Sequence, residues 1–180
     1  MRVVAGTAGG RLLRAPDGRE TRPTSDRVRE ALFNALGSLG AIDGAVVADL
    51  YAGSGALGIE ALSRGASHAT FVEVSATARA TVMANLAATD FGDRATVVAG
   101  DVLGHLRATS DRYDLVLADP PYAFDDWPAL AAAAVARLQP DGILVAESDQ
   151  VPDLGDAGAV LRSKRYGGTV VVFVRPRPDP

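Results

Sequence analysis

The sequence predicts a doubly wound α/β fold with a mostly parallel sheet, and three observations lead to this expectation. Short apolar runs alternate with helical segments from residue 41 to residue 148. Runs such as AVVADL and LVLA are apolar on both faces of the pleat, as expected for strands that helices cover on both sides. A glycine-rich turn follows the first of these runs and opens a helix.

The first 40 residues are expected to form a small extension, and residues 41–180 the core domain. The runs RVVA and RLLR flank GTAGG, which is a hairpin signal, and the polar segment APDGRETRPTSD follows them. From Arg27 onward apolar residues recur at helical spacing. They predict an amphipathic helix with Thr24, Ser25 or Asp26 as its N-cap.

The core is expected to contain five parallel strands with helices between them. The strand candidates are AVVADLY, HATFVEV, ATVVAGD, YDLVLAD and GILVAES. The helix candidates are ALGIEALSRG, SATARATVMANLAAT, a short segment from Leu103 to Arg107, and DDWPALAAAAVARLQP. Two further strands, AVLRSKRY and TVVVFVRP, flank Gly167-Gly168 and are expected to pair antiparallel at an edge of the sheet.

Composition excludes several classes of protein and site. The chain has 180 residues, no Cys and only two His, His68 and His105. A disulfide framework, a Cys nucleophile and a multi-His metal centre are therefore excluded, and no metal site is expected. No apolar run approaches the roughly 18 residues of a membrane span, and the opening lacks the apolar block of a signal peptide. We expect a cytoplasmic protein without a membrane partner.

Charge is distributed unevenly along the chain. Residues 1–29 hold seven bases and three acids (+4), residues 30–159 six bases and eighteen acids (−12), and residues 160–180 five bases and one acid (+4). All but one of the bases are Arg, whose planar guanidinium suits phosphate. An anionic polymer is therefore a candidate partner. The alternative is that these charges only solvate a surface.

The segment from Asp49 to Gly58 is a candidate cofactor site. Gly53 and Gly55 permit a tight turn after the first core strand, where the next helix offers free N–H groups. With Gly58 the segment also matches the G-x-G-x-x-G dinucleotide pattern, and Glu73 ends the next strand. A carboxylate there could hold the ribose hydroxyls of either NAD or S-adenosylmethionine.

Other carboxylates favour S-adenosylmethionine over NAD. Asp49 lies within a strand, where a charge is costly unless it meets a cation such as the ammonium of a methionine moiety. Asp101 ends the third strand, where it could accept from an adenine amino group while Val102 packs against the ring. A pyrophosphate would be repelled by these acids together with Glu73. The alternative is that Asp49 and Asp101 merely cap helices or turns.

The segment Asp119-Pro120-Pro121-Tyr122 follows the fourth core strand. Two prolines stiffen the backbone, and in a doubly wound sheet the fourth strand lies beside the first. The Asp119 carboxylate and the Pro120 carbonyl could accept hydrogen bonds from an amine whose lone pair faces a methyl donor. Tyr122 offers a ring on which a base could stack.

These motifs resemble those of class I S-adenosylmethionine-dependent methyltransferases that act on exocyclic amines. The opening RVVAGTAGGRLL, the segment from Arg22 to Asn34 and the late Tyr166-Gly167-Gly168-Thr169 narrow the resemblance to the RsmD family of bacterial 16S rRNA (guanine-N2) methyltransferases. The resemblance covers nearly the whole chain. It implies a Rossmann-like methyltransferase core in which the N-terminal extension contacts RNA.

The resemblance also implies a function and residue roles. The expected reaction is methyl transfer from S-adenosyl-L-methionine, which leaves S-adenosyl-L-homocysteine, to the N2 amine of a guanine in 16S rRNA of the 30S subunit. A monomer could perform it. The cofactor would be held by Asp49, Tyr51, Ala52, Gly53, Ser54, Gly55, Glu73, Val74, Asp101 and Val102. Asp119, Pro120, Pro121 and Tyr122 would hold the flipped base, and Arg2, Arg11, Arg14, Arg22, Arg27 and Arg29 would bind phosphates.

Three alternatives stay open at this point. The first keeps the enzyme class but methylates DNA adenine or a protein amide. The second is an NAD-dependent oxidoreductase built on Gly53, Gly55 and Gly58. The third is a non-catalytic RNA-binding or ribosome-assembly factor that retains the fold.

Overall fold

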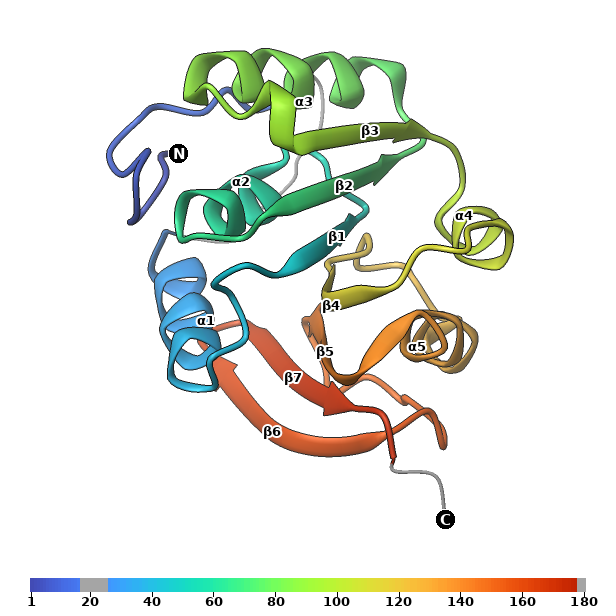
Figure 1. Ribbon diagram of the computed structural model, residues 1–180. Coiled ribbons are helices and arrows are strands. Elements are labelled where there is room, and N and C mark those ends of the chain that lie inside the picture. The colour runs from blue at the N-terminus through green and yellow to red at the C-terminus, as the bar shows by residue number, and fades with distance from the viewer. Residues whose placement is uncertain (17–25, 178–180) are drawn as a thin grey trace.

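A seven-stranded sheet forms the centre of the computed structural model, which describes residues 1–16 and 26–177. The strand order is β3-β2-β1-β4-β5-β7-β6, which runs from top to bottom in Figure 1. The strands are β1 (Val46–Leu50), β2 (His68–Glu73), β3 (Ala95–Ala99), β4 (Tyr113–Ala118), β5 (Leu138–Ser148), β6 (Ala159–Tyr166) and β7 (Thr169–Arg175).

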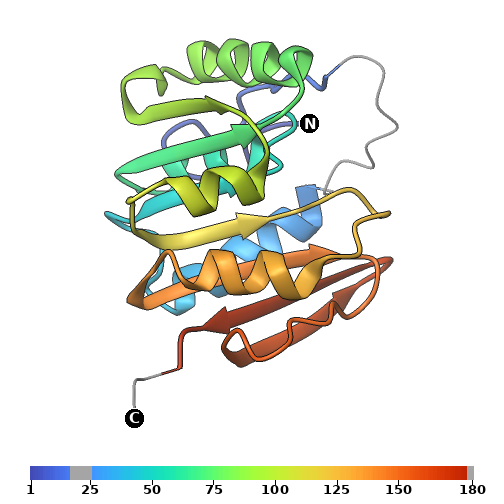
Figure 2. The same cartoon turned by 90° about the vertical axis from the view of Figure 1, so that its right-hand side faces the viewer.

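Helices cover both faces of the sheet, as the apolar strands predict. One face carries α1 (Asp26–Ser38), α2 (Ala56–Ser63) and α3 (Ala76–Thr89), and the other carries α4 (Val102–Ala108) and α5 (Trp127–Val135). Figure 2 shows α4 and α5 in front of the sheet. A 3₁₀ turn, η1 (Gly92–Arg94), follows α3. Two buried clusters result, because alternate residues of each strand face opposite sides.

The predicted strand directions are confirmed. β1 pairs in parallel with β2 and β4, and β4 pairs in parallel with β5. β7 pairs antiparallel with both β5 and β6. The last strand of the chain thus lies inside the sheet, and β6 forms the outer edge.

The opening of the chain forms a narrow hairpin with a single β-bridge, between Arg2 and Leu12. The Val3 N–H donates to the Arg11 carbonyl at 3.0 Å, and the Gly10 N–H donates to the Val3 carbonyl at 2.8 Å. Val3 and Leu13 are buried in the same cluster as α1 and α2. The division of the chain at residue 40 stays a prediction.

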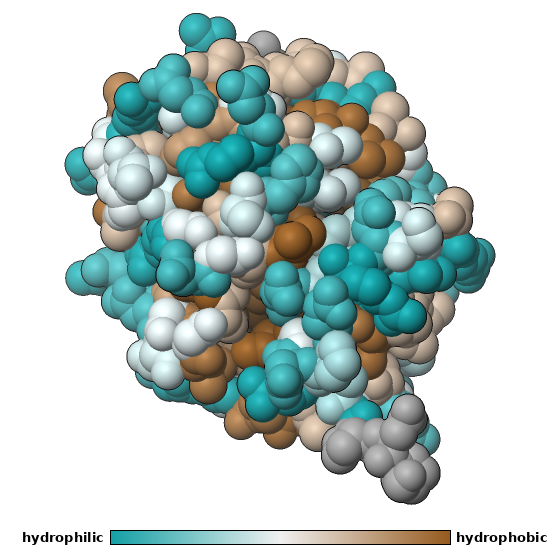
Figure 3. Space-filling view, in the orientation of Figure 1, coloured by the Kyte–Doolittle hydropathy of each residue, from teal (hydrophilic) through white to brown (hydrophobic). Residues whose placement is uncertain are grey.

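Helix starts follow the expected chemistry with small shifts. α1 begins at Asp26, while the candidate caps Thr24 and Ser25 lie outside the described residues. The Asp101 carboxylate caps α4, which begins at Val102, one residue before the predicted Leu103. Among the described residues no helix is both long and apolar enough to cross a membrane. In the orientation of Figure 1, hydrophobic residues form separate patches among hydrophilic ones (Figure 3).

Candidate functional site

A pocket of about 670 Å³ opens at the carboxyl ends of the central strands. Leu50, the last residue of β1, lies opposite Val72 of β2 and Ala118 of β4 in the register. The segments that follow these strands therefore begin at the same edge of the sheet, which is where ligands bind in open α/β folds. The predicted residues that line the pocket are Asp49, Tyr51, Ala52, Gly53, Ser54, Glu73, Val74, Asp101, Val102, Asp119, Pro120, Pro121 and Tyr122.

The glycine turn has a backbone that few other residues could adopt. Gly53 has φ +57° and Gly55 φ +76°, so both lie in the left-handed region. Tyr51 also has a positive φ, 61°, which is uncommon for a bulky residue. Gly55 is buried and does not line the pocket, although it precedes the first residue of α2. Its contribution is to the shape of the turn.

Asp49 is a buried carboxylate at the base of the pocket. Its side chain accepts a hydrogen bond from the Gly58 N–H at 2.8 Å. Burial raises the pKa of Asp49 from 3.8 to about 8; the Gly58 hydrogen bond opposes this shift, and the negative charges of Asp119 and Glu73 add to it. A ligand cation beside this carboxylate would remove much of the penalty, so the site fits the ammonium of a methionine moiety.

Glu73 and Asp101 also line the pocket, and both carboxylates accept backbone hydrogen bonds. Glu73 accepts from Gly53 at 3.0 Å and from Ser75 at 2.8 Å. Asp101 accepts from Gly104 at 2.8 Å as the cap of α4. Each carboxylate oxygen has two lone pairs, so these bonds leave room for ligand hydroxyl or amino groups. Asp101 therefore caps a helix, as the alternative explanation expected, and also lines the pocket.

Gly58 is needed for packing inside the protein. A Cβ at this position would lie 2.4 Å from Phe71 Cε1, and the Phe71 ring is fully buried. The Gly58 residue does not line the pocket. Packing of α2 against β2 therefore explains why a glycine occupies position 58. The G-x-G-x-x-G pattern is then no evidence that the pocket binds a dinucleotide.

The Asp119 to Tyr122 segment leaves β4 directly beside the glycine turn. Pro120 is buried and Asp119 half-buried, whereas the Tyr122 side chain is 53% exposed. An aromatic chain joins the two segments, because Phe124 packs edge-on against Tyr51 at 5.7 Å and against Trp127 at 5.5 Å between ring centroids. Burial, with Asp101 and Asp126 nearby, raises the pKa of Tyr51 to about 12.

Several pocket residues were not predicted from the sequence. They are Met1, Pro16, Val28, Ala56, Leu57, Val72, Gly100, Glu147 and the run Tyr166-Gly167-Gly168-Thr169, and Arg29 lines the pocket too. Glu147 could have been predicted from the sequence, because it is an acid near the carboxyl end of a core strand, as Asp49 and Glu73 are. The run from Tyr166 to Thr169 reaches the pocket because β6 ends and β7 begins there.

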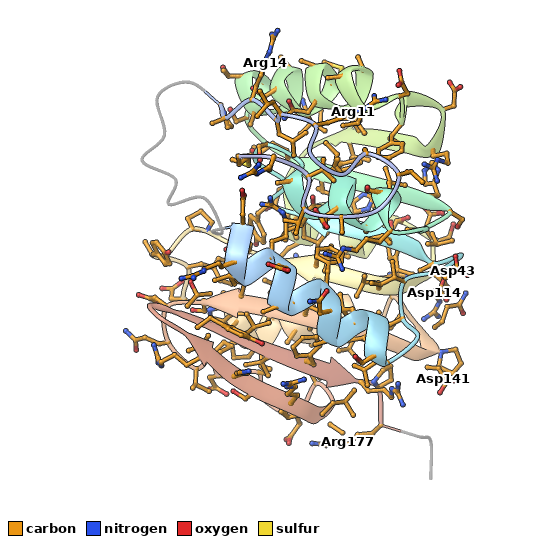
Figure 4. All side chains as sticks on the ribbon, turned by 90° about the vertical axis from the view of Figure 1, so that its left-hand side faces the viewer. Arg11, Arg14, Asp43, Asp114, Asp141 and Arg177 are labelled. Carbon is orange, nitrogen blue, oxygen red and sulfur yellow. The ribbon has the colours of Figure 1, made fainter. Side chains whose placement is uncertain are left out.

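The predicted RNA-contacting arginines occupy different environments. Arg2, Arg14 and Arg27 are exposed, and Arg11 is half-exposed in an ion pair with Asp90 at 2.6 Å. Figure 4 shows Arg11 and Arg14 on the opening segment, on the side where α3 lies. Arg22 lies outside the described residues. These assignments stay predictions.

Arg29 requires a correction. Its side chain is fully buried; it donates to the Arg2 carbonyl and to Asp26 at 2.9 Å, and it lies 3.6 Å from the buried Glu60 carboxylate. A guanidinium enclosed by these groups joins α1 to the opening segment and to α2. Its burial argues against the phosphate contact expected of it.

Side chains of α2 and α3 hold the opening segment next to the pocket. Glu60 accepts from the backbone N–H groups of Val4 at 2.7 Å and Ala5 at 3.1 Å. Asn85, for which the sequence suggested no role, bonds both backbone groups of Arg14 and donates to the Ser54 carbonyl at 2.8 Å. Asn85 therefore joins the opening segment to the glycine turn.

The part of the chain that the structure describes contains no group of three or more potential metal-ligating side chains.

Comparison with known proteins agrees with this geometry. The family model "Conserved hypothetical protein 95" matches residues 1–175. A Bacillus subtilis protein described as an rRNA methyltransferase is 38% identical over 98% of this chain and 100% of its own length. The Escherichia coli ribosomal RNA small subunit methyltransferase D is 41% identical over 68% of this chain and 60% of its own length. The chain belongs to the RsmD family.

Solved structures support the same conclusion about fold and enzyme class. An Escherichia coli protein described as a methyltransferase superposes with a TM-score of 0.84 at 31% identity, covering 99% of both chains. The Thermus thermophilus 16S rRNA N2 G1207 methyltransferase, solved with S-adenosylmethionine and guanosine, superposes with a TM-score of 0.73 at 25% identity, covering 91% of this chain and 45% of its own. The expectations of a class I methyltransferase fold and of S-adenosylmethionine as cofactor are confirmed.

Proposed function

We propose that this protein transfers a methyl group to the exocyclic N2 amine of a guanine in 16S ribosomal RNA, in the context of the small subunit in the cytoplasm. The observation that carries the proposal is that one pocket contains both the Asp119-Pro120-Pro121-Tyr122 segment and the carboxylates Asp49 and Glu73. Relatives named as small-subunit rRNA methyltransferases and a neighbour that binds guanosine support the choice of base.

One group of pocket residues would bind the cofactor, and another group would bind the base. When bound, S-adenosylmethionine supplies a methyl group already activated by a sulfonium. Asp49 would pair with the ammonium of its methionine moiety, and Glu73 would accept hydrogen bonds from the ribose hydroxyls. Val74, 67% exposed, and the buried Val102 would contact the adenine.

The base side of the pocket needs acceptors more than it needs acid–base catalysis. The Asp119 carboxylate and the Pro120 carbonyl would accept from the N–H groups of the guanine amine and aim its lone pair at the methyl group, so that catalysis consists mainly of alignment. Tyr122, with its half-exposed ring, would stack on the base. The guanine must leave its stack to reach them.

Transfer of labelled methyl from S-adenosylmethionine tests the proposal. The acceptors are small ribosomal subunits, deproteinised 16S RNA, DNA and bulk protein, and nucleoside mass analysis identifies the product. We expect N2-methylguanosine in ribosomal RNA, and the comparison of subunits with free RNA tells whether ribosomal proteins are required. Label only in DNA or in protein would overturn the proposed substrate, and binding of NADH in place of S-adenosylhomocysteine would overturn the cofactor assignment.

A further inference from the structure

Strand β6 forms an exposed edge that leads into the pocket. Seven of its eight residues are exposed, and the eighth, Tyr166, lines the pocket. β7 runs antiparallel to both β5 and β6, so β6 runs in the same direction as β5 and β4. The carboxyl end of β6 therefore reaches the edge of the sheet at which the base-holding segment lies.

Two cations of β6 lie on the same face of the sheet as α1. Arg162 pairs with Phe173 and Lys164 with Val171 in the register, and both partners belong to the buried cluster that contains α1. Directly paired residues of antiparallel strands share a face, which places Arg162 and Lys164 on the α1 side. The Lys164 ammonium lies 5.0 Å from the centroid of the Tyr166 ring. Figure 4 shows β6 and β7 along the lower margin of α1 on this side.

These two charges are not neutralised by any acid in residues 1–16 and 26–177, because neither forms an ion pair there. Arg165 differs, since it faces the other side of the sheet and donates to the Asp149 carbonyl at 3.1 Å. Among the residues that the structure describes, the pocket wall contains five acidic side chains, Asp49, Glu73, Asp101, Asp119 and Glu147, and one basic side chain, Arg29, which already pairs with Asp26 and Glu60.

An acidic pocket creates a problem for an RNA substrate. The base enters next to carboxylates, which repel the phosphates on either side of the target nucleotide. Those phosphates must stay outside the rim and need cations there. Arg162 and Lys164 meet this requirement. Along β6 they lie four and two residues before Tyr166, respectively, or about 13 and 7 Å along an extended strand.

We propose that Arg162 and Lys164 form a phosphate-binding surface that holds the RNA backbone next to the flipped nucleotide. This surface is separate from the arginines of the opening segment, and the proposal rests on RNA being the substrate. The competing explanation is that the two charges protect an exposed edge strand from pairing with another sheet.

The double substitution Arg162→Gln with Lys164→Gln tests the proposal in the full chain. The matched control is Arg107→Gln with Arg177→Gln, which removes the same charge. Arg107 is exposed in the last turn of α4, on the other face of the sheet, and Arg177, labelled in Figure 4, follows the end of β7. Neither residue lines the pocket. Affinity for single-stranded 16S RNA fragments is measured between 50 and 200 mM salt, together with methyl transfer, S-adenosylhomocysteine binding and sedimentation.

We expect the salt slope of RNA binding to fall by about 0.7 for each lost contact, or about 1.4 for the double variant. The affinity advantage of the wild type would then shrink about sevenfold from 50 to 200 mM salt. KM for RNA should rise, with kcat at saturating RNA and S-adenosylhomocysteine affinity unchanged. The control should keep the wild-type slope.

Two results would overturn the proposed phosphate-binding surface: a wild-type salt slope in the β6 variant, or an equal loss of slope in the control. Self-association of the β6 variant together with a wild-type slope would show that the two charges protect the edge strand instead. The proposed function fails separately, if the wild-type chain transfers no methyl to 16S RNA, either free or in small subunits. If the wild-type chain methylates RNA but the β6 variant keeps the wild-type salt slope, only the proposed phosphate-binding surface is overturned.

Discussion

At the scale of single residues, the position of each carboxylate decides what it can do. Asp49, buried at the end of β1, has its pKa raised to about 8, because burial and the charges of Asp119 and Glu73 outweigh the hydrogen bond from Gly58. Asp101 is exposed and caps α4. Two residues of the same type near the ends of neighbouring strands thus differ in burial and in the backbone group that each one binds.

The raised pKa of Asp49 predicts a pH-dependent affinity for the cofactor product. Below pH 8 the ammonium of S-adenosylhomocysteine must displace a proton from Asp49, so affinity should rise with pH by up to about tenfold per unit between pH 6 and 8. Asp49→Asn should bind more weakly and lose this dependence. Calorimetry at several pH values measures both effects. The control Asp93→Asn, on η1, should retain the wild-type profile, and an unchanged profile in Asp49→Asn would contradict the assignment.

The same shift has a consequence for stability. The folded protein binds the Asp49 proton more tightly than the unfolded chain does, so this group's contribution to stability is lost as pH rises from about 4 to about 8. The free energy of unfolding of Asp49→Asn should therefore decline less over this range than that of the wild type, in denaturant titrations without cofactor. A parallel decline in both proteins would argue against a protonated Asp49.

Tyr122 is predicted to act through its ring. Loss of base stacking costs about 1 to 3 kcal/mol, so Tyr122→Ala should lower kcat/KM for RNA by about 5- to 150-fold while S-adenosylhomocysteine affinity stays the same. Tyr122→Phe keeps the ring and should retain most of the activity. Steady-state methyl transfer separates the two variants, and equal losses in both would assign the effect to the hydroxyl.

At the scale of elements, contacts between helices, strands and the segments after the strands hold the pocket in shape. α2 approaches β2 closely enough that Gly58 has no room for a Cβ beside Phe71. The Asn85 amide of α3 fixes both the glycine turn and the opening segment. The Tyr51–Phe124–Trp127 contacts join the turn to the segment after β4. These contacts connect elements that are distant in the sequence.

A pair of glycine substitutions tests this packing. Gly58→Ala should destabilise the protein by about 1 to 3 kcal/mol, because the added methyl meets a buried ring that cannot move cheaply. Gly104→Ala in α4 should stabilise it by about 0.5 to 1 kcal/mol, because its Cβ would meet only Asp101 at 3.4 Å and alanine favours a helix. Denaturant unfolding measures both changes, and stabilisation by Gly58→Ala would contradict the packing argument.

At the scale of the whole molecule, the charges separate into an acidic pocket and basic segments at both ends of the chain. This arrangement suits a ligand with a cationic head and an apolar ring, and it disfavours a pyrophosphate inside the pocket. The described part of the opening contributes Met1 and Pro16 to the pocket wall. Binding a cofactor should therefore stabilise the opening segment together with the core.

Cofactor binding should raise the melting temperature of the entire protein. At 100 times its Kd, a ligand adds about 2.7 kcal/mol, which corresponds to about 5 to 10 °C for a chain of this size. S-adenosylhomocysteine should produce this shift and NADH should not. Differential scanning fluorimetry checks both, and a shift with NADH alone would restore the dinucleotide alternative.

Much of the architecture could be predicted from local patterns. Apolar runs such as LVLA predict strands, because a strand buried on both faces is apolar at every position. The helical spacing of apolar residues after Arg27 predicts a helix, because only one side of it is buried. Asp49, Glu73 and Asp101 could be predicted as neighbours, because parallel strands bring their carboxyl ends to one edge. The sequence alone therefore determined the fold class, the family resemblance and the acidic character of the pocket.

Contacts between segments that lie far apart in the chain could not be predicted from the sequence and are known only from the tertiary structure. The burial of Arg29 against Glu60 depends on how α1 packs on α2, and its sequence neighbours resemble those of a surface arginine. Three other features also depend on residues that are distant in the sequence. They are the place of β7 inside the sheet, the hydrogen bonds of Asn85 to Arg14 and Ser54, and the approach of β6 to the pocket. Local patterns carry no record of them, because their energy depends on which distant surface each residue meets.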